Sequence, residues 1–129
     1  MRKMIKGVGV DIVEIKRMED AVGRWGRRFL ERVFTEGEIQ YCLAKSRPAS
    51  SFAVRFAAKE AVIKAVGGGV SFREIEIANM SGKAETGRPE IVRAGRLEKA
   101  LAESGIKNIH LSLSHEREFG VAFVVAEGS

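Results

Sequence analysis

Residues 52–66 constrain the fold more than any other stretch of this sequence. The segment contains neither glycine nor proline and is rich in alanine, so it is predicted to form a helix. Its apolar side chains point in nearly every direction around the helix axis, which is typical of a buried helix. It nevertheless carries four charged residues, which are Arg55, Lys59, Glu60 and Lys64. Because buried charge is costly unless it is paired or binds an ion, the helix is predicted to form part of a functional site.

A further candidate site residue, Asp11, lies on the first predicted strand, residues 5–13. Apolar side chains alternate there with a second set made of Gly7, Gly9 and Asp11, so one strand face consists of two glycines leading to a carboxylate. Glycine in a strand permits the close approach of a ligand or of another backbone. The strand alone therefore supports two interpretations equally: a ligand site, or a tight packing corner followed by an aspartate at a helix start.

Three more helices are expected around these two segments. The first covers residues 14–30, with Trp25 among its core-facing positions, and is predicted to break at Gly23 and Gly26. The second begins at Thr35 with a capping box to Glu38 and runs to residue 43. The third covers residues 94–104. Ser50 and Ser51 are expected to cap the start of the 52–66 helix. The helix is expected to stop at Gly67, Gly68 and Gly69.

The second half of the chain is predicted to be rich in strands. They are expected at residues 75–79, 90–93, 109–115 and 120–126, with turns at 81–83 and 86–89. The last two strands form a hairpin, and His115 lies at the end of its first strand, where it is a candidate for phosphate binding or acid–base work. The whole pattern predicts one α+β domain over residues 1–129.

The charge of the chain indicates anionic partners. Its formal net charge is +5, which fits nucleic acid, phosphorylated ligands or acidic proteins without choosing among them. The polar face of the 14–30 helix has nearly one sign. A patch of one sign is better explained by an acidic partner than by solvation alone. Its basic residues, with the one just beyond the helix, are Lys16, Arg17, Arg24, Arg27, Arg28 and Arg32.

Cysteine usage and hydropathy predict a cytoplasmic protein without a membrane segment. The single cysteine, Cys42, excludes an internal disulfide, is typical of a reducing compartment, and is predicted to be inert packing. No apolar run approaches the roughly 20 residues that a membrane span needs. Glycines and Asp11 interrupt the apolar N-terminal stretch, so no signal peptide is expected.

Asp11 and Glu60 have the character of magnesium ligands, because Mg²⁺ is usually held by one or two carboxylates, water and substrate phosphates. Lys64, Arg55 and His115 would suit the phosphates. These residue types together indicate phosphoryl-transfer chemistry. The sequence has no Walker A motif, kinase-type glycine loop, zinc-protease motif or nucleophile elbow.

Three motifs resemble those of the holo-[acyl-carrier-protein] synthase family, the small trimeric 4′-phosphopantetheinyl transferases. They are GVGVDIVE at 7–14 followed by Lys16-Arg17, RFAAKEA at 55–61 followed by Lys64-Ala65, and LSLSH at 111–115. Phe34-Thr35 with Glu38, and Gly87-Arg88-Pro89, are also similar, while the link at 67–72 is shorter than in relatives. The resemblance implies that family's fold, a mostly antiparallel sheet packed on a long buried helix with shorter helices.

The resemblance also implies a reaction and its residues. The phosphopantetheine arm of coenzyme A moves to a serine of apo-acyl carrier protein, with release of adenosine 3′,5′-bisphosphate, in fatty acid biosynthesis. The matching positions would be Asp11 and Glu60 for Mg²⁺, Glu60 and Lys64 for catalysis, Lys64 for the pyrophosphate of coenzyme A, Arg55 and His115 for its nucleotide end, and Arg17, Arg24 and Arg28 for carrier docking. The family's sites lie between subunits of a homotrimer, which leaves open whether Asp11 and Glu60 come from one chain or two.

Several alternatives stay open. The base that activates the serine is either Glu60 or a metal-organised water, and Lys59 has no assigned role. A basic nucleic-acid-binding module would explain the charge, but Trp25, Tyr41 and most phenylalanines fall at core-like spacings instead of interleaving with the basic face. An inactive homologue serving as an assembly subunit is disfavoured, because the proposed metal and phosphate residues are intact.

Overall fold

The computed structural model describes residues 2–79 and 88–129. Its strands are β1 (Met4–Glu14), β2 (Ile77–Asn79), β3 (Pro89–Ile91), β4 (Ile106–His115) and β5 (Phe119–Gly128). Its helices are α1 (Ile15–Val33), α2 (Glu36–Leu43), α3 (Pro48–Val66) and α4 (Gly95–Glu103), with a short 3₁₀ turn at Phe72–Glu74. The predicted turns at 81–83 and 86–87 lie outside the described residues.

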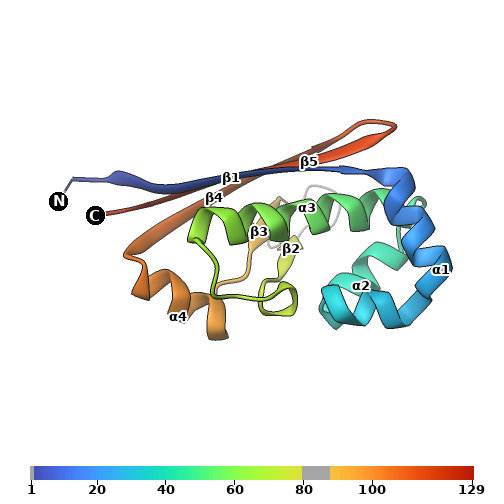
Figure 1. Ribbon diagram of the computed structural model, residues 1–129, viewed down its shortest axis with the longest axis horizontal. Coiled ribbons are helices and arrows are strands. Elements are labelled where there is room, and N and C mark those ends of the chain that lie inside the picture. The colour runs from blue at the N-terminus through green and yellow to red at the C-terminus, as the bar shows by residue number, and fades with distance from the viewer. Residues whose placement is uncertain (1, 80–87) are drawn as a thin grey trace.

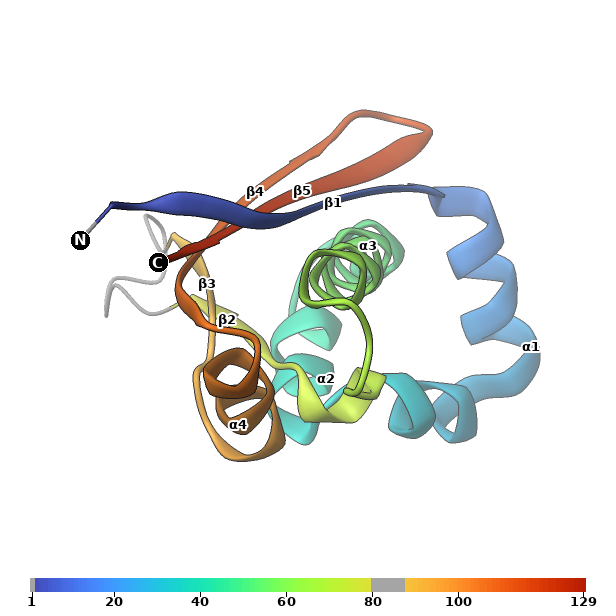
Figure 2. The same cartoon turned by 60° about the vertical axis from the view of Figure 1, so that its left-hand side comes forward.

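The architecture is a sheet laid on one long helix. Strands β1, β5 and β4 form an antiparallel sheet in that order, and β2 and β3 form a separate two-stranded antiparallel sheet. Helix α3 runs along one face of the larger sheet, with α1 and α2 towards one end of the molecule and α4 towards the other (Figure 1). Seen nearly along its axis, α3 lies beneath the sheet, with α1 beside it and with α2 and α4 on the side away from the sheet (Figure 2). The predicted α+β class, with an antiparallel sheet on a long buried helix, is confirmed.

The two glycines of β1 explain how closely the sheet approaches α3. A Cβ atom on Gly7 would lie 2.0 Å from the carbonyl oxygen of Ala65, and one on Gly9 would lie 1.9 Å from that of Ala61. No side chain fits at either position. The glycine face of the strand is therefore a packing seam against the helix backbone, and the small alanines of α3 form the other side of the seam.

The charged residues of α3 divide into buried and accessible pairs. Arg55 and Lys59 are buried, whereas Glu60 is partly exposed and Lys64 exposed. Burial on all sides, predicted for the whole helix, therefore holds for most of residues 52–59 and fails on the Glu60–Lys64 side. That side faces the end of β1 that carries Asp11.

Lys59, left without a role by the sequence, joins three segments. Its ammonium group lies 2.7 Å from Glu38 Oε1 and donates to the carbonyl oxygens of Phe72 and Ile75. Glu38 also accepts from the backbone N–H groups of Thr35 and Ile77, so the capping box of α2 is part of the same buried network. Burial lowers the pKa of Lys59, and its pairing with Glu38 opposes that change. This ion pair fixes the chain after α3 against α2.

Several local predictions were wrong. Helix α3 begins at Pro48, with Arg47 as its N-cap, because proline fits the first helical turn; Ser50 and Ser51 lie inside the helix. Helix α1 is interrupted at Gly26 alone, whose φ of 60° and ψ of −145° are not helical. Trp25, expected in the core, is 59% exposed beside this interruption.

Other boundaries differ by a few residues. The strand expected at 75–79 begins later, because a 3₁₀ turn precedes it, and β4 begins at Ile106. The hairpin of β4 and β5 is confirmed, with Glu116 N–H donating to the Phe119 carbonyl across its turn. Cys42 is buried as predicted, and burial raises the pKa of its thiol. Within the described residues, none of the helices has the length and apolar character needed to cross a membrane.

Candidate functional site

Asp11 and Glu60 meet in one hollow of about 390 Å³ at the junction of β1, α1 and α3. Glu14 and Arg17 add two more charged side chains to its lining. The remaining wall is mostly apolar, formed by Ile12, Val13, Met18, Phe29 and Phe56. The two residues that the sequence nominated as metal ligands therefore lie together on a single chain.

Lys64 is placed next to this hollow by its contacts with β1. Its ammonium group donates to the carbonyl oxygen of Val10 at 2.9 Å and lies 3.4 Å from Asp11 Oδ1. Glu60 precedes Lys64 by one helical turn. The Gly7–Gly9 seam sets this arrangement, because it brings β1 close enough for an α3 side chain to reach the carboxylate. Asp11, Glu60 and Lys64 thus form one acid–base cluster.

The donor set in this hollow fits a hard divalent cation that keeps part of its water shell. Among the described residues, no three His, Cys, Asp or Glu side chains gather closely enough to hold a metal ion by themselves. Two carboxylates are available instead, and the Asp11 side chain is 19% exposed. Mg²⁺ usually takes one or two protein carboxylates and completes its shell with water and substrate phosphate oxygens.

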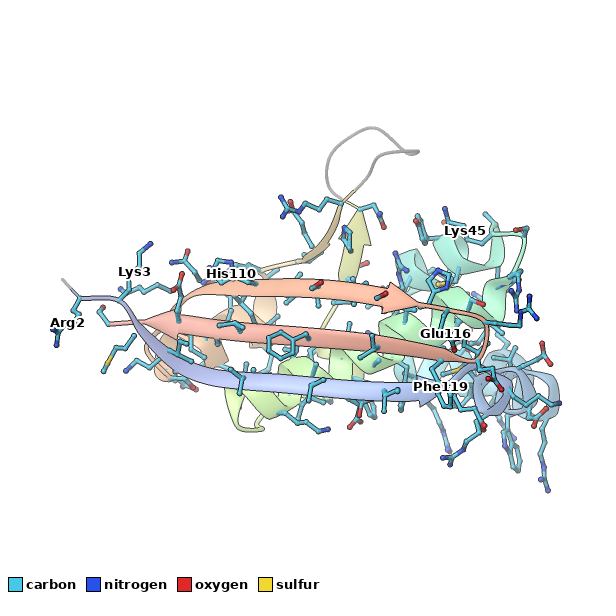
Figure 3. All side chains as sticks on the ribbon, turned by 90° about the horizontal axis from the view of Figure 1, so that it is seen from above. Arg2, Lys3, Lys45, His110, Glu116 and Phe119 are labelled. Carbon is cyan, nitrogen blue, oxygen red and sulfur yellow. The ribbon has the colours of Figure 1, made fainter. Side chains whose placement is uncertain are left out.

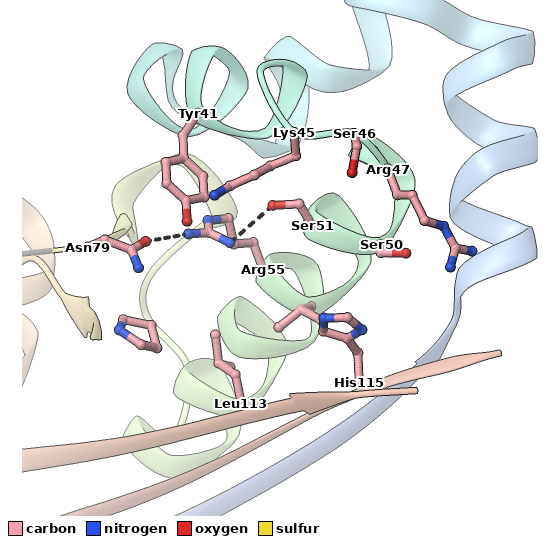
Figure 4. A pocket seen from close by; sticks show the side chains of 12 residues that line it. Tyr41, Lys45, Ser46, Arg47, Ser50, Ser51, Arg55, Asn79, Leu113 and His115 are labelled. Atoms are coloured by element: carbon pink, nitrogen blue, oxygen red, sulfur yellow. Dashed lines mark hydrogen bonds between the residues drawn. The ribbon is translucent and has the colours of Figure 1, made fainter. Parts of the chain in front are cut away.

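Arg55 lies in a second hollow, of about 410 Å³, between α2, α3, β3 and the end of β4. Its guanidinium group stacks 4.3 Å from the ring of Tyr41 and donates to Asn79 Oδ1 at 2.8 Å and to Ser51 Oγ at 3.3 Å (Figure 4). Arg55 is only 6% exposed, and its Nε finds no hydrogen-bond partner in the part of the chain that the structure describes. A buried cation held this firmly is prepared for an anion.

The second hollow is strongly basic. His115 reaches it from the end of β4, as its position in the sequence suggested (Figure 4). Lys45 and Arg47, on the loop between α2 and α3, also line it and were not selected from the sequence. Nothing in the sequence singles them out, because cations are common in a polar loop before a proline. The three cations, the imidazole of His115 and the ring of Tyr41 suit a phosphorylated aromatic ligand.

The structure therefore divides the predicted site residues between two hollows. Asp11 and Glu60 line the first, whereas Arg55 and His115 line the second. The two hollows have no lining residue in common among the described residues. Within one chain, the acidic cluster and the basic hollow remain separate features.

The three arginines nominated for docking are all exposed on α1. Other basic residues of this helix are neutralised locally, since Lys16 pairs with Asp20 at 2.9 Å and Arg27 pairs with Glu31 and Glu36. None of the docking residues forms an ion pair within residues 2–79 and 88–129; they are Arg17, Arg24 and Arg28. Their charges remain available to an acidic partner, and Arg17 also borders the acidic hollow.

The sheet laid on a buried helix is the fold of a phosphopantetheinyl transferase, because the chain matches that family along most of its length. The family model described as the 4′-phosphopantetheinyl transferase superfamily matches residues 7–124. Within that class, the chain belongs to the holo-[acyl-carrier-protein] synthase family and is a transferase.

Close relatives support the assignment over nearly the full chain. The holo-[acyl-carrier-protein] synthase of Halothermothrix orenii is 47% identical, and the match covers 96% of this chain and 98% of the relative. The crystal structure of the Neisseria meningitidis synthase superposes with a TM-score of 0.85 at 40% identity, covering 95% of this chain and 98% of that one. The Bacillus anthracis synthase, solved in complex with CoA (3′,5′-ADP), gives a TM-score of 0.76 at 39% identity and covers 98% and 99% of the two chains.

Proposed function

We propose that this chain transfers the 4′-phosphopantetheine arm of coenzyme A to a serine of apo-acyl carrier protein, with Mg²⁺, in the cytoplasm, as part of fatty acid biosynthesis. The observation that carries the proposal is the meeting of Asp11 and Glu60 in one hollow, with Lys64 3.4 Å from Asp11. The names of the relatives support the carrier protein as acceptor.

The reaction is a displacement at phosphorus. The serine oxygen forms a bond to the pantetheine-bearing phosphorus of coenzyme A, and the bond from that phosphorus to the 5′-phosphate oxygen breaks. Adenosine 3′,5′-bisphosphate leaves, and the serine proton passes to a base, either Glu60 or a water molecule. Lys64 stabilises or protonates the leaving phosphate, since its ammonium group lies at the edge of the acidic cluster. Mg²⁺ held by Asp11 and Glu60 would offset the negative charge of the pyrophosphate.

The basic hollow is the proposed site for the nucleotide end of coenzyme A. Arg55 supplies a cation and His115 an imidazole that can donate a hydrogen bond, and Lys45 and Arg47 add two further cations. The guanidinium of Arg55 is already oriented by Tyr41, Ser51 and Asn79, so little side-chain entropy is lost when it binds a phosphate. The Bacillus anthracis relative in complex with CoA (3′,5′-ADP) supports a nucleotide as the ligand.

A homotrimer is the assembly we propose. The outer face of the larger sheet is apolar on β1 and β5, where Val8, Val10, Ile12, Phe119 and Phe123 are 41–67% exposed alongside Ile5. Figure 3 looks onto this face, with Phe119 near the hairpin turn and His110 on β4. A continuous apolar surface of this kind is typical of an interface between subunits. Separate hollows on one chain also support sites that are completed where two subunits meet, so that one coenzyme A reaches both.

The decisive experiment is a transfer assay. The purified protein is incubated with apo-acyl carrier protein, coenzyme A and Mg²⁺, and the carrier is weighed by mass spectrometry. We expect the carrier to gain the mass of the phosphopantetheine arm only when all components are present, with equimolar adenosine 3′,5′-bisphosphate. Absence of any mass gain across a wide range of Mg²⁺ concentrations would overturn the proposal. A nucleic-acid-binding protein would instead retain an oligonucleotide and leave the carrier unchanged.

A further inference from the structure

The buried ion pair between Glu38 and Lys59 takes no part in the proposed reaction. Glu38 is 1% exposed and Lys59 is 0% exposed, and their charged atoms lie 2.7 Å apart. Burying two charges is costly, and apolar side chains of similar volume often stabilise a core as well or better. The presence of the pair is therefore better explained by the geometry that it fixes than by the stability that it contributes.

The pair joins three elements that are separate in the sequence. Glu38 belongs to α2 and Lys59 to α3, and together they hold residues 72–77, which lead into β2. The Lys59 ammonium group donates to two backbone carbonyl oxygens of this segment. At the other end of the segment, Ile77 N–H donates to Glu38 Oε2 at 2.7 Å. One carboxylate and one ammonium group thus set how α2, α3 and β2 lie against one another.

Each of these three elements also carries part of the support of Arg55. Tyr41, whose ring centroid lies 4.3 Å from the guanidinium carbon, is on α2 three residues after Glu38. Asn79, which accepts from Arg55 Nη2 at 2.8 Å, is the last residue of β2. Arg55 itself lies on α3, one helical turn before Lys59. A shift of α2 or β2 against α3 would therefore move a group that holds the guanidinium.

We propose that Glu38 and Lys59 are positioning residues for nucleotide binding: by fixing α2, α3 and β2 together, the pair holds the Arg55 guanidinium ready for a phosphate of coenzyme A. The identity of the ligand rests on the proposed function. A charged pair suits this task, because its hydrogen bonds are directional and favour one arrangement of the three elements. An arginine that is already held in place loses little side-chain entropy when it binds an anion.

Binding of adenosine 3′,5′-bisphosphate to the full chain tests the proposal without the transfer reaction. Glu38→Gln combined with Lys59→Met, the neutral-pair variant, replaces both charges by side chains of similar size. We expect calorimetry to give a Kd raised about 3–10-fold, as for the loss of one pre-ordered side chain, with the circular dichroism spectrum retained. In the transfer assay, KM for coenzyme A should rise by a similar factor, while kcat and KM for the carrier change less than about twofold.

Two further variants separate positioning from stability. Ile106→Ala, at the opposite end of β4 from His115, removes a buried side chain and should lower stability without changing the Kd. Thr35→Ala is milder, because it removes a hydroxyl that donates to Glu76 Oε2 at 2.9 Å, a second link between the start of α2 and residues 72–77. We expect Thr35→Ala to raise the Kd about twofold, and this result decides the question if the neutral-pair variant does not fold.

A double-mutant comparison with Arg55→Met identifies the route. If the pair acts through Arg55, the neutral-pair variant should cause no further loss of affinity once Arg55 has been replaced. Additive losses would contradict the proposal. Because Lys59 directly precedes Glu60, the Mg²⁺ dependence of transfer is measured as well. A changed Mg²⁺ requirement with an unchanged Kd would assign the pair to the acidic cluster and overturn the proposal.

The outcomes distinguish this inference from the function on which it rests. Wild-type Kd in the neutral-pair variant, together with normal transfer by the wild-type chain, would overturn the positioning role and leave the proposed function intact. A wild-type chain that binds adenosine 3′,5′-bisphosphate but transfers nothing would overturn the function, while the Kd values still decide the positioning role. A wild-type chain that does not bind the nucleotide, or equal increases in KM for both substrates in the neutral-pair variant, would overturn the inference.

Discussion

The ammonium group of Lys64 lies 3.4 Å from Asp11 Oδ1. A divalent cation bound at this site would contact the same carboxylate. Both side chains are accessible to water, so their mutual attraction contributes little to stability. Their value lies in position: a carboxylate for a metal and an ammonium group for phosphate lie side by side. Single substitutions in this cluster should therefore affect the reaction far more than the fold.

Asp11→Ala and Glu60→Ala are each expected to reduce kcat/KM for transfer by at least about 100-fold, because each removes a proposed metal ligand. Thermal unfolding should change little, since neither side chain is fully buried. The matched control is Asp20→Ala, which removes an exposed carboxylate paired with Lys16 on α1. Rates within a fewfold of wild type would remove Asp11 and Glu60 as metal ligands.

His115→Ala tests the basic hollow without disturbing a buried group, because His115 is exposed at the end of β4. We expect its loss to raise KM for coenzyme A roughly 10-fold, as expected for one charge-assisted contact, and to weaken inhibition by adenosine 3′,5′-bisphosphate in parallel. His110→Ala, on the same strand but outside this hollow, is the control. A change in carrier KM alone would contradict a nucleotide role.

Among single residues, candidate site residues could be recognised from the sequence where they break the local pattern. Asp11 and Glu60 could be found because a carboxylate beside strand glycines, or within an apolar helix, violates the local pattern. Lys45 and Arg47 could not, because cations in a polar loop are ordinary and only the fold brings them to Arg55. Trp25 was misplaced because its core position was read from one helical period counted through residues 14–30, across the break at Gly26 that the sequence itself predicted.

The elements that position the cluster are β1 and α3, held in contact along the glycine seam. Gly9→Ala would direct a Cβ to within 1.9 Å of the Ala61 carbonyl oxygen, so strand and helix must separate. We expect a loss of about 1–3 kcal/mol in the free energy of unfolding, together with reduced transfer. Urea unfolding and the transfer assay measure the two effects.

Gly23→Ala is the matched control for the seam variant. Among the described residues nothing lies within 4 Å of the Cβ it would add, and Gly23 is helical within α1. Alanine should therefore stabilise the chain by about 0.5–1 kcal/mol. If Gly9→Ala were as stable and active as Gly23→Ala, the glycines of β1 would not be needed for packing.

Lys59 provides the second prediction about elements. Lys59→Met should lower the free energy of unfolding by about 3–5 kcal/mol, because it leaves the Glu38 carboxylate buried without its charge partner. Adding Glu38→Gln should recover part of that loss, since the uncompensated charge is removed. Lys99→Met, at an exposed position of α4, is the control and should change stability by less than about 0.5 kcal/mol. Equal stability of the two methionine variants would refute the structural role of the buried pair.

For the whole molecule, the sheet has one face on α3 and one face uncovered. Helix α3 covers the inner face, where Ala122, Val124 and Ala126 of β5 are fully buried. On the outer face, Val10 and Phe123 lie opposite each other on β1 and β5, and both are about half exposed. The alternation of the strands was predictable from the sequence. Which face the helix would cover was not, because the glycine face rather than the valine face packs on α3.

Phe123→Glu tests whether that outer face joins subunits. Phe123 lies on the central strand, between Val10 and Ser112, so a carboxylate there would be buried in any assembly that covers the sheet. We expect sedimentation at micromolar concentration to give about three times the chain mass for the wild type and the chain mass for the variant. In the monomeric variant, each hollow would lack the neighbouring subunit that completes the site. The transfer rate should therefore fall together with the measured mass, while the secondary structure is retained. Leu43→Glu, an equivalent change on α2, is the control and should leave both mass and transfer unaltered. A wild-type monomer, or a fully active Phe123→Glu monomer, would exclude sites completed between subunits.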